Sequence, residues 1–342
     1  MSFARSITKL PSKMSFARNV STTAKAPRHL LTIDNLTSDE LTKLVDRALV
    51  HKKYIKEGTV PESVATSLRG KTVPMLFSKR STRTRVSTEG AATYLGGHPM
   101  FLGKDDIQLG VNESLYDTSK VISSMTSCMV ARVGPHSDIQ GLVKGSSVPV
   151  INALCEMFHP LQAITDIITI RENFPEIKGL KLAWIGDANN VLHDLAIACA
   201  KSGINVAAAT PKEYPIDLDI VEMIRRAGDE TGAIFEVTND PLVAVKDAHI
   251  LVTDTWISMG QEAETQLKLK QFAGYQITND MATKGGASPN WKFMHCLPRH
   301  KEEVDDEVFY SDRSLVFPEA ENRLYAAIAV LEAFVVNGGK IE

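Results

Sequence analysis

The sequence predicts an α/β protein made of two doubly wound domains with parallel sheets. Short apolar segments that suit buried strands alternate with helical patterns along most of the chain, as in sheets covered by helices on both faces. The chain has 342 residues, which is long for a single hydrophobic core. The polar segment "SKRSTRTRVS" (78–87) lies between a strand-like and a helix-like segment, and this is the arrangement of a βα unit.

The elements follow one another in a regular order. A helix is predicted over 37–55, because "TSDE" resembles a capping box and leucines recur at helical spacing. A buried strand is predicted over 71–78, and a helix over 84–97 that glycines end. Further strands are predicted at 98–103, 128–134, 148–154, 181–187, 204–211, 248–255, 275–281, 292–298 and 314–320.

The order of these segments predicts two domains, 29–170 and 171–319. The helix predicted over 159–174 lies at their boundary. The last predicted helix, 320–338, has apolar positions on much of its circumference, so we expect it to be buried and to pack back on the first domain.

Composition and charge exclude several classes of protein. Hydrophobic residues make up 44% of the chain and the net charge is −3, so the basic signature of nucleic-acid binding is missing. No apolar run approaches the roughly 20 residues of a membrane-spanning helix, and we expect no membrane partner. The four cysteines are widely spaced and form no CxxC pair, which favours reduced thiols over disulfides or a metal site.

The N-terminal segment, residues 1–28, differs from the rest. It carries six basic side chains, and no acidic residue occurs before Asp34. Serine and threonine are frequent, and the long apolar core of a secretory signal is missing. This composition is typical of mitochondrial transit peptides, so we expect the mature protein in the mitochondrial matrix. A disordered cytosolic tail is the alternative interpretation.

A candidate anion site lies at the start of the helix predicted over 84–97. Unpaired N–H groups and a partial positive charge gather at a helix N-terminus. Ser81, Thr82, Arg83 and Thr84 add hydroxyls and a guanidinium group that suit phosphate oxygens. No glycine run of a Walker loop is nearby. A solvated basic helix start is the alternative.

Other candidates are polar residues at helix starts and strand ends. His159 and Gln162 share one face at the start of a helix, where they suit a carbonyl and an NH₂ group. Cys296 and Asp254 follow predicted strands at the edge where open α/β sheets bind ligands. A structural role is the alternative for each residue taken singly.

Four motifs together carry a family resemblance. The segments "STRT" (81–84), "HPLQ" (159–162), "DTWISMG" (254–260) and "HCLPR" (295–299) occur in this order. With these spacings, the chain from about residue 29 to the C-terminus resembles the ornithine carbamoyltransferases. The resemblance implies transfer of a carbamoyl group from carbamoyl phosphate to the δ-amine of L-ornithine, without a metal or redox cofactor. It also implies two α/β domains joined by interdomain helices.

The resemblance assigns roles to individual residues. Those implied to bind carbamoyl phosphate are Ser81, Thr82, Arg83, Thr84, Arg132, His159, Gln162, Cys296, Leu297 and Arg323. Those implied to hold the amino-acid end of ornithine are Asn190, Asp254, Ser258 and Met259. Gln108 matches a loop that reaches the neighbouring subunit's phosphate site, which implies a homotrimer.

The chemistry of the transfer explains these residue types. The δ-amine, with a pKa near that of lysine, must lose a proton before it attacks the carbamoyl carbon. The tetrahedral oxyanion then needs hydrogen-bond donors aimed at it, and Thr84, Arg132 and His159 are expected to supply them. Cys296 is expected beside the incoming amine, either as proton acceptor or as part of its polar surroundings.

The motifs disfavour three rival functions. An aspartate carbamoyltransferase would share the first two motifs, but its second substrate is a dicarboxylate, and "DTWISMG" offers an acid where a base is expected. A nicotinamide dehydrogenase is disfavoured because the turn "GDANNV" (186–191) lacks the later glycines of GxGxxG. A catalytically inactive homologue is disfavoured because every motif position carries a chemically competent residue.

Overall fold

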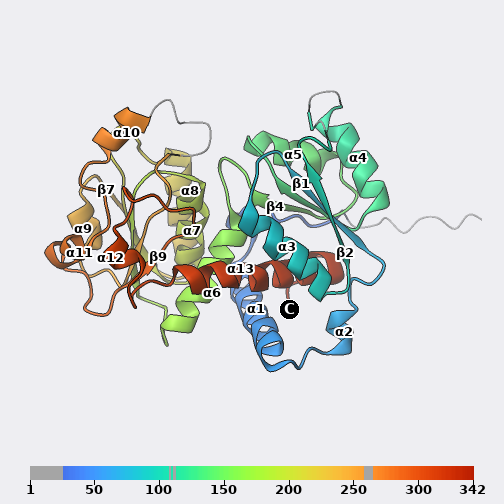
Figure 1. Ribbon diagram of the computed structural model, residues 1–342, viewed down its shortest axis with the longest axis horizontal. Coiled ribbons are helices and arrows are strands. Elements are labelled where there is room, and N and C mark those ends of the chain that lie inside the picture. Colours follow the sequence, from blue (N-terminus) through green and yellow to red (C-terminus); the bar gives the residue numbers. More distant parts are fainter. Residues whose placement is uncertain (1–25, 108, 111–112, 258–264) are drawn as a thin grey trace, which may run out of the picture.

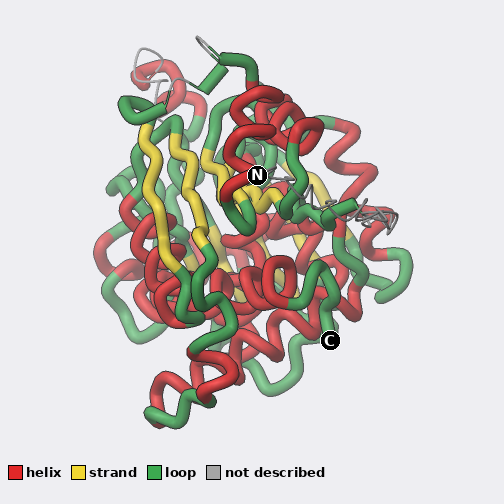
Figure 2. The backbone as a smooth tube through the Cα atoms, turned by 90° about the vertical axis from the view of Figure 1, so that its right-hand side faces the viewer, coloured by secondary structure: helices red, strands yellow, loops and turns green. Residues whose placement is uncertain are grey.

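The computed structural model describes residues 26–107, 109–110, 113–257 and 265–342, which form two α/β halves (Figure 1). Each half is a parallel sheet between helices, and Figure 2 shows strands with helices on both sides. The prediction of two doubly wound, parallel-sheet units is confirmed. In the described part of the chain, no helix is long and apolar enough to cross a membrane.

The first half contains a four-stranded sheet with the order β2-β1-β3-β4. Each neighbouring pair is parallel, so the carboxyl ends of the strands share one edge. Its strands are β1 (Thr72–Phe77), β2 (His98–Gly103), β3 (Met129–Arg132) and β4 (Val150–Leu154). Its helices are η1 (Ile33–Asn35), α1 (Ser38–Glu57), α2 (Glu62–Ala65), α3 (Thr82–Tyr94), α4 (Leu115–Met125) and α5 (His136–Gly145).

The second half contains a five-stranded sheet with the order β7-β6-β5-β8-β9, again parallel throughout. Its strands are β5 (Lys181–Ile185), β6 (Asn205–Ala209), β7 (Phe235–Thr238), β8 (Ile250–Val252) and β9 (Lys292–Met294). Its helices are α7 (Asn190–Lys201), α8 (Leu218–Gly228), α9 (Pro241–Val245), α10 (Thr265–Gln271), α11 (Asn279–Gly285) and α12 (Asp306–Phe309).

Two buried helices join the halves. α6 (Pro160–Asn173) is buried without interruption from Pro160 to Ile170. α13 (Val316–Leu331), which continues as the π-helix η3 (Glu332–Val336), crosses from the second half to the first in Figure 1. Buried polar side chains of α6 and α13 form hydrogen bonds with each other. For example, Asn322 Nδ2 donates to Thr169 Oγ1 at 3.0 Å. Their packing places residues of both helices at the boundary of the halves.

Two predicted strands are wrong. Segment 275–281 forms only an isolated bridge at Ile277, because Thr278 caps α11 by accepting a hydrogen bond from Met281 N. Segment 314–320 forms only an isolated bridge at Ser314, because α13 begins at Val316 and has Pro318 in its first turn, where proline is tolerated. The edge strand β7 was not predicted, because its side chains lie partly in solvent and Val237 is 44% exposed.

Candidate active site

A cleft of about 1110 Å³ lies between the two halves. It opens at the carboxyl ends of the strands, where parallel α/β folds bind ligands. Twelve residues predicted for the site line it: Ser81, Thr82, Arg83, Thr84, Arg132, His159, Gln162, Asn190, Asp254, Cys296, Leu297 and Arg323. Gln108, Ser258 and Met259 lie outside the described residues. The cleft therefore brings residues from all four motifs together.

One wall of the cleft is the N-terminus of α3. Ser81 is the N-cap, and its hydroxyl accepts a hydrogen bond from Thr84 N at 3.3 Å. Thr82 and Arg83 follow in the first turn, where backbone N–H groups have no partner within the helix. No acidic residue occupies that turn, so the positive end of the helix faces the cleft uncompensated.

Two buried arginines also line the cleft. Arg132 ends β3 and Arg323 lies in α13, and they are 8% and 3% exposed. Burial lowers the pKa of each guanidinium to about 10, so both stay charged at neutral pH. Within the described chain, Arg132 Nε and Arg323 Nη1 lack a hydrogen-bond acceptor. Buried charged donors without partners are costly, and an anion bound in the cleft would satisfy them.

His159 and Gln162 enter the cleft from the start of α6. His159 is the N-cap, followed by Pro160 at the first helical position. Burial lowers the pKa of His159 well below 6.5, and Arg323, Arg132 and Arg83 lower it further, so its imidazole is neutral at physiological pH. Its Nδ1 is another buried atom without a partner in the described chain.

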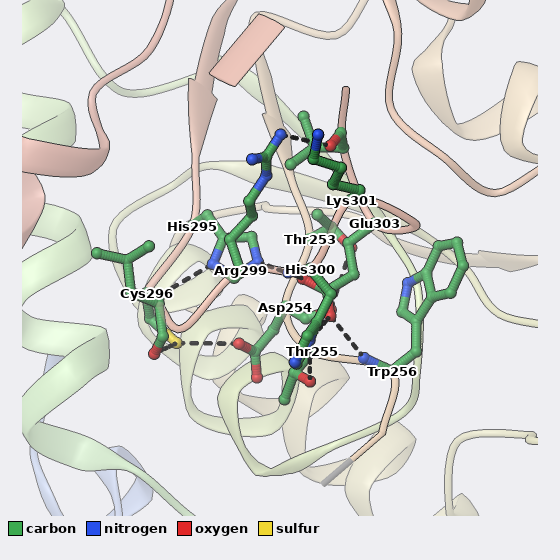
Figure 3. A network of polar contacts seen from close by, with 12 residues as sticks. Thr253, Asp254, Thr255, Trp256, His295, Cys296, Arg299, His300, Lys301 and Glu303 are labelled. Atoms are coloured by element: carbon green, nitrogen blue, oxygen red, sulfur yellow. Dashed lines mark hydrogen bonds and ion pairs between the residues drawn. The ribbon is translucent and has the colours of Figure 1, made fainter. Parts of the chain in front are cut away.

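The opposite wall comes from the second sheet. Asp254 follows β8, and Cys296 follows β9, so their side chains meet as Figure 3 shows, with Cys296 Sγ donating to Asp254 Oδ1 at 3.1 Å. Asn189 Nδ2 donates to Asp254 Oδ2 at 2.9 Å. Burial, followed by the charge of Asp254, raises the pKa of the Cys296 thiol well above 9. Cys296 is therefore a protonated thiol in this arrangement.

A hydrogen bond crosses the cleft. Arg83 Nη2, from the first half, donates to the carbonyl oxygen of Leu297 in the second half. Leu297 has a positive φ of 63°, which is uncommon for a residue with a branched side chain. The guanidinium of the predicted phosphate site and the backbone beside Cys296 are thus in direct contact.

Comparison with known proteins assigns both halves to one family. The carbamoyl-P binding domain of aspartate/ornithine carbamoyltransferases matches residues 28–172, and the Asp/Orn binding domain of the same family matches residues 178–334. The chain belongs to the aspartate/ornithine carbamoyltransferase family.

Individual members of the family are similar over nearly their whole length. The mitochondrial ornithine carbamoyltransferase of Coccidioides immitis is 62% identical, over 94% of this chain and 97% of that protein. The mitochondrial ornithine transcarbamylase of Pachysolen tannophilus is 61% identical, over 96% and 95%. A crystal structure of the Coccidioides immitis enzyme superposes with a TM-score of 0.87 at 61% identity, covering 93% of this chain and 100% of that one.

Sequence reasoning missed a group of residues that support the family's HCLPR segment. Figure 3 shows Glu303 at the centre of this group. Glu303 Oε2 accepts from His295 Nε2 at 2.9 Å, and Glu303 Oε1 accepts from Trp256 N at 3.3 Å. His295 Nδ1 accepts from Leu297 N at 2.9 Å, which assigns the ring proton to Nε2. Glu303 thereby ties the DTW and HCLPR segments together.

A second missed contact supports the "GDANN" turn. Lys268 of α10 is 2% exposed, and its Nζ lies 2.6 Å from Asp187 Oδ2 and 2.6 Å from the carbonyl oxygen of Trp256. No spacing in the sequence connects residues 81 positions apart, so only the fold could reveal this pair.

Among the residues that the structure describes, no group of three or more His, Cys, Asp and Glu side chains has the arrangement to hold a metal ion.

Proposed function

We propose that this protein transfers the carbamoyl group of carbamoyl phosphate to the δ-amine of L-ornithine, giving L-citrulline and phosphate, a step of arginine biosynthesis and of the urea cycle. The observation that carries the proposal is the cleft itself. It has a positively charged, anion-binding site on one half and the Asp254–Cys296 pair on the other. Membership of the carbamoyltransferase family and relatives named ornithine carbamoyltransferase support it.

The first half is proposed to hold carbamoyl phosphate. Ser81, Thr82, Arg83 and Thr84 bind the phosphate with the backbone N–H groups of α3. The buried donors of Arg132, Arg323 and His159 lie on the carbamoyl side, where a bound carbonyl oxygen would occupy them. The backbone of Cys296 and Leu297 borders its amide group.

The second half is proposed to hold ornithine. Asn190, Asp254, Ser258 and Met259 take its α-amino and α-carboxylate end. The buried acid Asp254 suits a substrate that carries an amine, whereas a dicarboxylate such as aspartate would meet repulsion there. Aspartate therefore remains the alternative substrate that the experiment must exclude.

The reaction follows from this placement. The lone pair of the neutral δ-amine forms the new C–N bond at the carbamoyl carbon, and the carbonyl oxygen becomes an oxyanion that Thr84, Arg132 and His159 stabilise. The amine gives its extra proton to the departing phosphate, the oxyanion re-forms the carbonyl as the C–O bond to phosphate breaks, and phosphate leaves with the electron pair. Because Cys296 is protonated, it is better suited to form part of the polar surroundings of the amine than to accept its proton.

A homotrimer in the mitochondrial matrix is proposed as the working form. Large apolar side chains are exposed on the first half, with Val86 65%, Val121 49% and Met125 70% exposed, and contact with another subunit would remove such side chains from water. Gln108 would then serve the phosphate site of the next subunit. The names of the relatives and the basic composition of residues 1–28 support the mitochondrial location.

The direct test is citrulline formation by the purified protein. With carbamoyl phosphate, we expect citrulline from ornithine and no carbamoyl product from aspartate. Arg83→Ala should reduce kcat/KM about 10²–10³-fold, because a charged donor to the leaving phosphate is lost. Carbamoylation of aspartate in place of ornithine would contradict the substrate assignment.

A further inference from the structure

Hydrogen bonds within the protein fix the orientation of the Gln162 amide. Its Nε2 donates to Asp166 Oδ1 at 2.7 Å and to Glu319 Oε1 at 2.9 Å, which uses both amide N–H groups. Its Oε1 accepts no hydrogen bond from the described residues, and the side chain lines the cleft. The amide therefore presents only an acceptor to a ligand.

The two carboxyl groups that hold Gln162 are themselves buried, each 2% exposed. Burial raises the pKa of both carboxyl groups, and two buried carboxyl groups around one amide suit a state in which they share one proton. Asp166 Oδ1 and Glu319 Oε1 both act as acceptors for the amide N–H groups, so a flipped Gln162 would set its own oxygen against them.

The carboxyl groups come from different elements. Asp166 lies one turn after Gln162 on α6, and Glu319 lies in the first turn of α13. Glu319 Oε2 also accepts a hydrogen bond from His295 N, directly after β9, at 3.0 Å. The pair thus joins α6, α13 and the end of β9 around the Gln162 amide.

We propose that Asp166 and Glu319 are a positioning pair that holds Gln162 Oε1 toward the NH₂ of the carbamoyl group and so selects an amide over a methyl group at that position. The inference rests on the proposed function, since the NH₂ belongs to carbamoyl phosphate. Neither carboxyl group touches the substrate; both act through Gln162.

The test compares two stable analogues, phosphonoacetamide and phosphonoacetone, which differ only in NH₂ against CH₃. Dissociation constants are measured by calorimetry on the full-length protein. We expect the wild type to bind the amide about 5–10-fold more tightly, the effect of one neutral hydrogen bond. Asp166→Leu removes one acceptor, lets the amide rotate, and should lower this ratio at least about threefold.

Matched variants separate positioning from general structure. Asp166→Asn keeps an oxygen for Gln162 and donates an N–H to Glu319, so it should keep the ratio within about twofold of the wild type. Glu319→Met should lower the ratio as Asp166→Leu does, and it carries the test if Asp166→Leu does not fold. Thermal unfolding identifies the folded variants.

The outcomes are distinguishable. Folded Asp166→Leu and Glu319→Met proteins that keep the wild-type ratio, even with weaker binding of both analogues, would overturn the positioning role. A wild type that makes citrulline but shows no preference for the amide would overturn it as well, while the proposed function stands. A wild type that binds neither analogue and makes no citrulline would overturn both.

Discussion

At the scale of single residues, burial sets the charge states that the chemistry uses. It leaves Arg132 and Arg323 charged, because their pKa values fall only to about 10. It makes His159 neutral and keeps Cys296 a thiol, because it disfavours the charged form of each side chain. The same physical effect thus separates permanent cations from neutral hydrogen-bonding groups within one cleft.

Replacement of Cys296 by serine should be tolerated better than replacement by alanine. Serine keeps the donor to Asp254 Oδ1, which the Cys296 thiol supplies at 3.1 Å. We expect Cys296→Ser to change kcat by about tenfold or less. Cys296→Ala should raise the KM for ornithine more than Cys296→Ser does, because it loses one hydrogen bond. Steady-state kinetics with ornithine as the varied substrate measure both. A loss of several orders of magnitude in kcat for Cys296→Ser would instead point to thiolate chemistry.

His159 should remain neutral between about pH 6 and 8. Burial and the cations Arg323, Arg132 and Arg83 lower its pKa well below 6.5, so protonation is confined to more acidic solution. NMR titration should show no change of its ring resonance in that range, with His159→Asn used to assign the signal. The acid limb of the wild-type pH–rate profile should also persist in His159→Asn. A resonance that titrates near pH 6.5 would contradict this charge state.

At the scale of elements, an ionic cluster joins α1 to the end of α13. Arg47 Nε lies 2.5 Å and His51 Nε2 2.9 Å from Glu332 Oε2. Partial burial would raise the pKa of Glu332, but hydrogen bonds from Arg47 and His51 outweigh it and lower the pKa to about 2. The helices that border the first half are therefore held partly by a contact that depends on pH.

The sign of this dependence follows from the lowered pKa. The contribution of Glu332 is complete above its unfolded pKa of about 4.5 and is lost as the pH falls toward about 2. Glu332→Gln should lower the free energy of unfolding by about 1–2 kcal/mol at pH 7, allowing for solvent screening of Arg47, and should flatten stability between these pH values. Urea unfolding at several pH values measures the effect.

Glu321→Gln provides the matched control for that experiment. Glu321 pairs with Lys56 between the same two helices, but their side chains are 41% and 56% exposed. Such an exposed pair should contribute no more than about 0.5 kcal/mol. Equal effects of the two substitutions would show that burial of the Glu332 cluster adds nothing.

At the scale of the whole molecule, the cleft exists because two α/β halves meet and both line it. α6 and α13 span the boundary, and Arg83 contacts the Leu297 carbonyl across it. The anion site around Arg83 and the Asp254–Cys296 pair come from different halves, so the proposed reaction requires the two halves to keep this arrangement. Asp166 and Glu319, which are proposed to position Gln162, join elements at this boundary.

The contribution of Arg28 to stability can be tested by truncation. Its guanidinium lies 2.6 Å from Glu40 Oε1 and 3.1 Å from the carbonyl oxygen of Gly339, so it joins the N-terminal segment to the C-terminus. We expect a chain of residues 29–342 to be less stable than one of residues 26–342 by about 1 kcal/mol, because this pair is partly exposed. Thermal unfolding of both truncated chains measures it. Arg28→Ala within residues 26–342 should reproduce the loss; equal stabilities would show that the contact contributes nothing.

The fold class and much of the cleft could be predicted from the sequence alone. The alternation of apolar strand-like segments with helical patterns is a local property of the sequence. Ser81–Thr84 and His159–Gln162 could be found because each group lies within one contiguous motif. Only the tertiary structure revealed Glu319, Glu303 and Lys268 beside the site, because each has a partner that is distant in sequence and that nothing local marks. Asp166 lies one turn from Gln162, but only the packing of α13 shows that it shares the Gln162 amide with Glu319. Tertiary packing also made residues 316–320 the start of α13 and keeps Cys296 a protonated thiol. Both depend on what surrounds a segment, and local sequence does not specify those surroundings.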